Sequence, residues 1–180
     1  MFNKNCTDKV TLRSIETTDI FDLWKIAFDG DLEWMKWNGP YLKDPVLSLE
    51  AFTKLAEERY VNNPFAAVVV YENQIVGQVF AFWEDGTLKQ WLEFGICLYD
   101  QSTWNKGIGS EVIQCWITYL FETVPLIQRV GFTTWSGNKG MMKIGEKLGM
   151  VREAQIRKVR YYQEKYYDSI KYGVLREEWQ

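Results

Sequence analysis

Hydrophobic and polar residues follow two periods along this chain, and these periods predict its strands and helices. A period of two is typical of a half-buried strand, and apolar residues at i, i+3 and i+4 are typical of an amphipathic helix. Strands are expected at residues 10–13, 65–71, 75–83, 89–99, 129–135, 151–161 and 165–177. Helices are expected at residues 20–27 with Thr17 or Thr18 as cap, 49–60 with Ser48 as cap, 108–121 and 141–150.

The order of these elements predicts a mixed α/β (α+β) fold in a single domain spanning residues 1–180. A strand and two helices come first, then a meander of strands, then two strand–helix units and a closing hairpin. Hairpins pair their strands antiparallel, so the sheet is expected to be mainly antiparallel and flanked by helices. A chain of 180 residues with 47% apolar residues can bury the core that such a domain needs.

Charge and composition exclude several classes of function. The net charge is −3, which gives no electrostatic case for binding nucleic acid. No apolar run approaches the ~18 residues that span a bilayer, so no membrane partner is expected. The chain has no His, which removes Ser-His-Asp and Cys-His catalytic pairs and Cys/His zinc sites, so no metal is expected.

The three cysteines, Cys6, Cys97 and Cys115, are odd in number and far apart. A disulfide framework is therefore not expected, and each cysteine is interpreted as a small, partly buried thiol. The first residues lack the apolar stretch of a secretory signal. These features predict a cytoplasmic enzyme.

A loop at residues 101–110 carries the clearest chemistry. The apolar strand before it ends at Tyr99, and a helix with an apolar face follows from Ile108. The first N–H groups of a helix have no partner within it and favour an anion, while Gly107 and Gly109 allow a close approach of the backbone. Lys106 adds a positive charge, although it also fits a solvated loop lysine. The spacing matches neither the Walker pattern nor the dinucleotide fingerprint, so the loop alone is a weak signal.

A second motif follows about thirty residues later. The strand at 129–135 leads into Asn138, then Met141, and then Glu146-Lys-Leu-Gly-Met150. Together with Trp104-Asn-Lys-Gly-Ile-Gly109, this order resembles the acyl-coenzyme A site of the GNAT superfamily of N-acyltransferases. The branch that it resembles most is that of the ribosomal-protein N-terminal acetyltransferases, and the resemblance covers residues 8–178.

The resemblance implies a domain whose central strands splay to form an acyl-CoA cleft, and it implies a set of cofactor-binding residues. Backbone groups of the central strand would hold pantetheine, the loop amides would hold the pyrophosphate, and Asn138 with Met141 would contact the arm from the next strand. Asn138 also fits a simple turn residue. The implied acetyl-CoA contacts are Ile96, Cys97, Leu98, Trp104, Asn105, Lys106, Gly107, Ile108, Gly109, Ser110, Asn138 and Met141.

The chain departs from the family pattern at three positions. Trp104 stands where the loop usually has Arg or Gln, which removes one side-chain donor. Gly145 stands where many members have a general-acid Tyr, and Met141 where the ribosomal branch has a Ser. Protonation of the leaving thiolate is therefore left to solvent, to the coenzyme thiol itself, to Cys97 or to a Tyr not yet placed.

Glu93, on the central strand, is the predicted catalytic base. A carboxylate among apolar neighbours suits this work, but the same pattern fits an ordinary solvent-facing strand residue. Glu33 and Glu84 are weaker candidates for the base. The segment at 28–41 combines acids with aromatic residues, which suits capture of a cationic amine or, alternatively, packing against the core. The predicted substrate-binding residues are Asp31, Glu33, Trp34 and Trp37.

The resulting functional hypothesis is transfer of an acetyl group from acetyl-CoA to a primary amine by direct attack in a ternary complex. The acceptor would be a small amine or a protein N-terminal amine, and a homodimer is left open. The alternative is an acyl-CoA-binding sensor or assembly module without catalysis, which the absent acid residue favours.

Overall fold

The computed structural model describes residues 2–179, which divide into two compact units. The first unit comprises residues up to 34 together with 45–81 and 95–116, and the second comprises 35–44, 82–94 and residues from 117 onward. Eight strands form one sheet in the order β1-β2-β3-β4-β5-β6-β8-β7. This open, mostly antiparallel sheet with four helices confirms the predicted fold class. Across residues 2–179, no helix combines the length and apolar character that spanning a bilayer requires.

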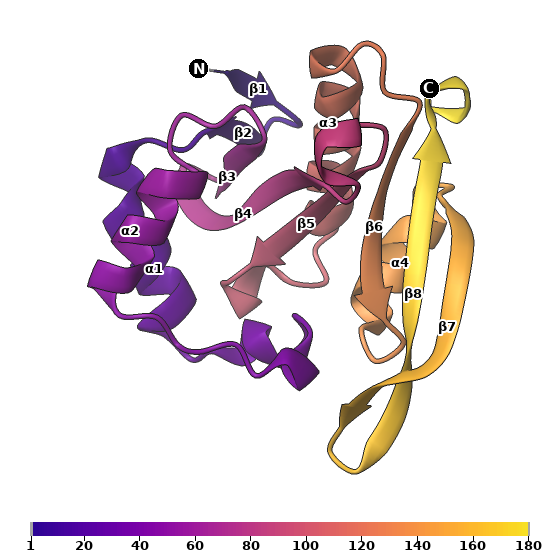
Figure 1. Cartoon of the computed structure of the whole chain (residues 1–180). Helices are drawn as coiled ribbons and strands as arrows, with labels where there is room; N and C mark the ends of the chain where they lie inside the picture. Colours follow the sequence, from indigo (N-terminus) through magenta and orange to yellow (C-terminus); the bar gives the residue numbers. More distant parts are fainter. Residues whose placement is uncertain (1, 180) are drawn as a thin grey trace. The chain divides into compact units, whose positions relative to one another are not determined.

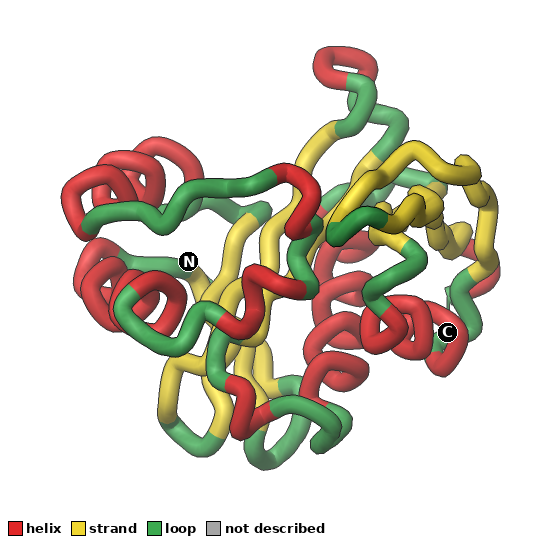
Figure 2. Tube along the Cα trace, turned by 90° about the horizontal axis from the view of Figure 1, so that it is seen from below, coloured by secondary structure: helices red, strands yellow, loops and turns green. Residues whose placement is uncertain are grey.

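The first unit contains the N-terminal strands and two helices that pack against each other. Helices α1 and α2 lie on one side of its strands, and the first half of α3 lies on the other (Figure 2). The central strand and α3 each run through both units. The elements are β1 (Asn3–Asn5), β2 (Val10–Ser14), α1 (Ile20–Phe28), α2 (Leu49–Arg59), β3 (Ala66–Tyr71), β4 (Gln74–Trp83), β5 (Leu92–Leu98) and α3 (Ile108–Thr123).

The second unit is built around the long hairpin of β7 and β8, with α4 beside it (Figure 1). Every residue of β6 pairs antiparallel with β8, from Arg129↔Leu175 to Trp135↔Ser169. In β8, Ile170, Tyr172 and Val174 are buried at alternating positions, but Ser169 and Gly173 are buried as well, so burial here does not follow the period of two that the sequence pattern predicts. The elements are β6 (Arg129–Trp135), α4 (Lys139–Lys147), β7 (Val151–Tyr162) and β8 (Lys165–Leu175).

Most element boundaries follow the sequence pattern, and the exceptions have local causes. Strand β5 begins at Leu92 rather than at residue 89, because Asp85 accepts hydrogen bonds from the backbone N–H groups of Gln90 and Trp91 and holds them in a turn. The predicted Thr cap is wrong: residues 17–19 form a 3-10 turn before α1. The predicted cap at Ser48 is confirmed, since its side chain accepts from the N–H of Ala51.

The prediction about the cysteines is wrong for two of the three. Cys6 and Cys115 form a disulfide whose Cα atoms lie 5.5 Å apart, while Cys97 is free. Strand β1 pairs with β2, and Cys6 follows directly after β1. The fold thereby places Cys6 beside Cys115 of α3. Two further contacts join this segment to the same helix, from Thr7 to Glu111 and from the Phe2 ring to Trp116.

Candidate active site

A short connection between β5 and α3 contains the residues that the sequence predicts to bind an anion. Asp100 caps a 3-10 turn at residues 101–103, and the chain then reaches α3 through Gly107, whose φ is +87°. A side chain disfavours this left-handed conformation, which explains the glycine at this position. The amides of Trp104 and Ser110 are already bonded, to Gln101 and Gly107.

Five consecutive backbone amides in the loop remain available. Among the described residues, no hydrogen-bond partner is found for the N–H groups of residues 105–109. These groups begin a helix of 16 residues, so its dipole adds to their preference for negative charge. The loop is therefore equipped to bind an anion through its backbone.

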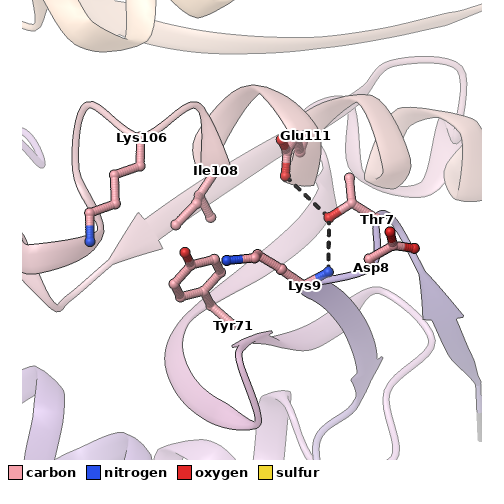
Figure 3. Close-up of a pocket in the computed structure, with 7 residues that line it drawn as sticks. All are labelled: Thr7, Asp8, Lys9, Tyr71, Lys106, Ile108 and Glu111. Atoms are coloured by element: carbon pink, nitrogen blue, oxygen red, sulfur yellow. Dashed lines mark hydrogen bonds between the residues drawn. The ribbon is translucent and has the colours of Figure 1, made fainter.

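The side chain of Lys106 faces a hollow of about 310 Å³ beside the first turn of α3 (Figure 3). Lys9 reaches into the same hollow from the start of β2, and Tyr71 closes it from the end of β3. Its lining also includes Asp8 and Glu111, so the hollow is of mixed charge rather than uniformly positive. Lys9 is in addition paired with Glu72 at 2.6 Å, which leaves Lys106 as the clearer anion-binding side chain.

Trp104, which stands where the family usually has Arg or Gln, folds back toward the strand. Its indole N–H donates to the carbonyl of Leu98 at 2.9 Å. The side chain therefore fixes the end of β5 and offers no donor to an anion in the loop.

The pairing of β5 with β6 is short. The parallel register contains two residue pairs, Leu92↔Val130 and Glu93↔Gly131. The following residues of β5, which include Ile96, Cys97 and Leu98, have no place in this register. On the other side, the carbonyl of Cys97 lies so close to Gly77 of β4 that a Cβ there would sit 2.1 Å from it.

The Cys97 thiol and two tyrosines near it are poor acids. Burial raises the pKa of Cys97 to about 12. Burial likewise raises the pKa of Tyr60 and raises that of Tyr99 well above its usual value. A group with such a pKa gives up its proton less readily than an ordinary thiol.

Asn138, the predicted contact of the coenzyme arm, makes two local hydrogen bonds in the second unit. Its side-chain oxygen accepts from the N–H of Met141 and caps α4, and its amide nitrogen donates to the carbonyl of Trp37 at 3.2 Å. The indole N–H of Trp135 donates to the same carbonyl at 2.9 Å. Asn138 thus links the start of α4 to the aromatic segment around Trp37.

Gly145, which stands where many family members carry a tyrosine, is closely packed. A Cβ at this position would lie 3.0 Å from both the Phe132 and the Tyr172 rings. The Tyr172 hydroxyl donates to Glu146 at 3.1 Å, so it is engaged in the protein. The missing acid is therefore a packing constraint of this chain as well as a sequence difference.

Glu93 is not the ordinary solvent-facing strand residue that its sequence pattern also fits. Its side chain is 1% exposed and accepts hydrogen bonds from Trp91, Thr133 and Lys171. The sequence analysis did not identify Thr133 or Lys171, since neither stands in a motif. The alternation of β8 gives one weak signal, because it places Lys171 on the face opposite buried Ile170 and Tyr172.

The predicted acceptor residues separate into buried and exposed groups. Trp34 is 9% exposed, donates to the carbonyl of Ala27 and packs edge-on against Tyr99, so its ring belongs to the core. Trp37 is 46% exposed. Asp31 accepts from the N–H of Glu33 and from the side-chain amide of Gln101, the first residue of the loop. Gln101 is a contact that the sequence analysis did not identify.

No metal site is evident in the part of the chain that the structure describes. Within residues 2–179, no group of three or more His, Cys, Asp or Glu side chains is placed to hold a metal ion.

Known acetyltransferases resemble this chain in sequence and in fold. An uncharacterized N-acetyltransferase derived from the SPbeta prophage of Bacillus subtilis, YokL, is 28% identical over 177 residues, covering 96% of this chain and 93% of that protein. A GNAT-family acetyltransferase from Bacillus anthracis superposes with a TM-score of 0.78 at 23% identity, covering 99% of this chain and all of that one.

Two structures with named acceptors share the fold at lower identity. Spermidine N-acetyltransferase from Vibrio cholerae, bound to CoA and spermine, has a TM-score of 0.77 at 18% identity over 96% of this chain and 99% of that one. RimL, which acetylates ribosomal protein L7/L12 and was solved with CoA, has a TM-score of 0.72 at 16% identity over 97% and 98%. The sequence model of the acetyltransferase (GNAT) domain matches residues 9–151, most of the chain. The chain therefore belongs to the GNAT acetyltransferase family.

Proposed function

We propose that residues 1–180 act as one catalytic domain that transfers an acetyl group from acetyl-CoA to a primary amine in a ternary complex. The observation that supports this most directly is the sequence of features along β5. Its pairing with β6 ends after Glu93, and five free amides follow the strand in the loop. An unpaired strand edge followed by an anion-binding loop suits a ligand with an extended amide arm and a pyrophosphate.

The proposed donor contacts follow from this arrangement. The amides of residues 105–109 and the Lys106 ammonium hold the pyrophosphate, and the backbone of Ile96, Cys97 and Leu98 pairs with pantetheine. Trp104 and Ser110 support the loop through their own hydrogen bonds, with Ile108 buried beneath it. Asn138 and Met141 contribute from the second unit, where Asn138 exchanges its bond to Trp37 for one to the arm.

The reaction forms a bond between the amine nitrogen and the thioester carbonyl carbon and breaks the bond between that carbon and sulfur. The amine must lose a proton, and the sulfur departs as a thiolate that a proton donor can neutralise. Cys97, Tyr60 and Tyr99 are poor proton donors for this thiolate, because burial raises the pKa of each above its own ordinary value. We infer that solvent protonates the thiolate or that it leaves as the anion.

The proposed acceptor is a cationic amine, either a small polyamine or a protein N-terminus. Asp31 and Glu33 supply negative charge, and the exposed Trp37 supplies an aromatic face. Trp34 is left out of this set because its ring is buried. The structures of RimL and of spermidine N-acetyltransferase name acceptors of both kinds.

Release of free coenzyme thiol from acetyl-CoA tests the function directly. The panel is spermidine, a peptide with a free N-terminus and, as matched control, the same peptide with a blocked N-terminus. Turnover with an amine, together with CoA binding by calorimetry, supports the proposal. If CoA binds but no amine is acetylated, the alternative is favoured, a non-catalytic acyl-CoA-binding module. The close packing at Gly145 supports this alternative.

The acceptor assignment has its own test. Asp31→Asn combined with Glu33→Gln is expected to raise KM for the amine and to leave KM for acetyl-CoA unchanged, and rising salt should weaken the amine in the same way. If neither change alters the amine KM, the acidic segment has a structural role only.

A further inference from the structure

A buried carboxylate joins three neighbouring strands of the second unit. Glu93 of β5 accepts from Thr133 of β6 at 2.6 Å through one oxygen and from Lys171 of β8 at 3.3 Å through the other. Lys171 also donates to the Thr133 hydroxyl at 2.7 Å, which closes a triangle of hydrogen bonds. The indole N–H of Trp91 adds a fourth bond, at 2.9 Å to Glu93.

Two cations and three carboxylates meet at this cluster. Arg129 lies 3.8 Å from Glu93, but it is bound by two nitrogens to Glu153. Lys171 lies 3.7 Å from Glu84 and stacks on the Trp91 ring at 5.0 Å. Glu93 is itself buried and has one cation directly bonded to it and a second close by, while Thr133 and Trp91 beside it are exposed.

These contacts make Glu93 poorly suited to accept a proton from a substrate. A carboxylate has about four acceptor positions, and three donors already occupy Glu93. The triangle of hydrogen bonds thus describes a buried carboxylate that is held in place.

The position of the cluster indicates what it holds. Glu93 belongs to the second and last pair of the β5–β6 register. Two backbone pairs alone are a weak attachment between strands, and the side-chain triangle adds bonds from β5 to both β6 and β8. Gly95, where β5 passes into the first unit, follows two residues later.

We propose that Glu93 and Lys171 are positioning residues: their ion pair, bridged by Thr133, holds the first half of β5 and so fixes where the free edge at Gly95–Leu98 begins. The inference rests on the proposed function, because that edge is the one assigned to the pantetheine arm. It replaces the base role for Glu93, and proton transfer from the amine then occurs to water.

Three variants separate positioning from base catalysis. Glu93→Gln and Lys171→Met each leave one member of a buried pair without its partner, which is strongly destabilising. The double variant Glu93→Leu with Lys171→Met removes both charges, and such apolar replacements are often tolerated. Lys165→Met is the matched control, since it removes a lysine from the exposed end of the same strand.

If the pair positions β5, both single variants raise KM for acetyl-CoA at least about fivefold and lower Tm, while kcat keeps its pH profile. The double variant then recovers KM to within about threefold of the wild type and keeps kcat within about tenfold, and the control changes neither. If single variants fail to fold while the double variant folds, the coupling is supported in the same sense.

Base catalysis by Glu93 gives the opposite pattern. Glu93→Gln and the double variant would both lose about 10²–10⁴ in kcat and the acidic limb of the pH profile, whereas Lys171→Met would not. That result, or additive changes in Tm and KM across the four proteins, overturns the proposal. Failure of the proposed function can be distinguished from failure of this proposal. If the proposed function is wrong, the wild-type protein binds no CoA, and this is measured before any variant is made. In that case the Tm values still report whether Glu93 and Lys171 are coupled.

Discussion

Loss of the disulfide between Cys6 and Cys115 is expected to lower the stability of the chain substantially. The two cysteines are 109 residues apart in sequence, so the bond closes a long loop in the unfolded chain. For this length, the chain-entropy relation gives about 16 cal/mol/K, or about 4.8 kcal/mol at 25 °C. In a domain of this size 1 kcal/mol corresponds to about 2–4 °C, so the expected fall in Tm is about 10–20 °C.

The measurement compares Cys6→Ser with Cys115→Ser in one double variant against the oxidised and reduced wild type. Thermal unfolding of the double variant should match the reduced wild type, because both lack the same covalent link. The contacts from Thr7 to Glu111 and from Phe2 to Trp116 remain in both, so a folded state is expected. If all three proteins unfold within about 2 °C of one another, the entropic reasoning is wrong.

Counting thiols provides the internal control. Cys97 is the one free cysteine among the described residues, and its raised pKa makes it slow to react in the folded protein. The unreduced protein should therefore show one thiol after denaturation, and the reduced protein should show three. Three thiols without reduction would mean that the bond does not form in solution.

Three further predictions concern single side chains. Gly107→Val should weaken the binding of CoA at least about tenfold, because φ is +87° at this position and a branched side chain would disturb the loop. The fold should survive, because open space surrounds the position. Unchanged affinity would remove the loop from the site. Asn138→Ala removes a helix cap and should lower the free energy of unfolding by ~1 kcal/mol. It should also weaken the binding of acetyl-CoA by ~1–3 kcal/mol and the binding of adenosine diphosphate by less. Equal losses for the two ligands would place Asn138 away from the arm. Asp19 is buried, which raises its pKa, but hydrogen bonds from Arg13 and the backbone of Glu16 outweigh this, and the net pKa is lowered. Ionised Asp19 therefore stabilises the protein above its unfolded pKa of about 3.9, and this stabilisation is lost as the pH falls through its pKa in the folded protein. Asp19→Asn should destabilise the protein at pH 7 and flatten the dependence of stability on acid pH. An unchanged dependence would contradict this.

The sequence predicted elements whose residues carry a strong apolar period. Strand β6 was placed with its observed bounds, and α2 within one residue, because their apolar residues repeat regularly and Ser48 marks the start of the helix. Strand β1 was not predicted, since Asn3, Lys4 and Asn5 show no apolar pattern and form a strand only by pairing with β2. Local patterns do not contain this information, because the pairing depends on the fold around it.

The loop was the most predictable part of the site, and the Glu93 cluster the least. Glycine at a left-handed position and free amides at a helix start are local consequences of the sequence, so Gly107 could be identified. The partners of Glu93 lie 40 and 78 residues further along the chain. Their meeting depends on the register of three strands, which the apolar pattern constrains only to a face. The sequence therefore led to the prediction of a catalytic carboxylate but could not indicate that Glu93 is already hydrogen-bonded to other strands.

We expect the acidic and aromatic segment at 28–41 to couple donor and acceptor binding within this chain. At one end, Asp31 accepts a hydrogen bond from Gln101, the first residue of the loop, three residues before Trp104. At the other end, the carbonyl of Trp37 accepts from Asn138, the residue proposed to contact the coenzyme arm. If Asn138 turns its amide to acetyl-CoA, Trp37 keeps only its bond from Trp135 at this carbonyl, and the segment gains freedom. Because coupling between two ligands is reciprocal, an amine held by this segment should then change the affinity for acetyl-CoA by the same factor. Calorimetric titration of CoA with and without spermidine measures that factor, and in Asn138→Ala the factor should fall to one.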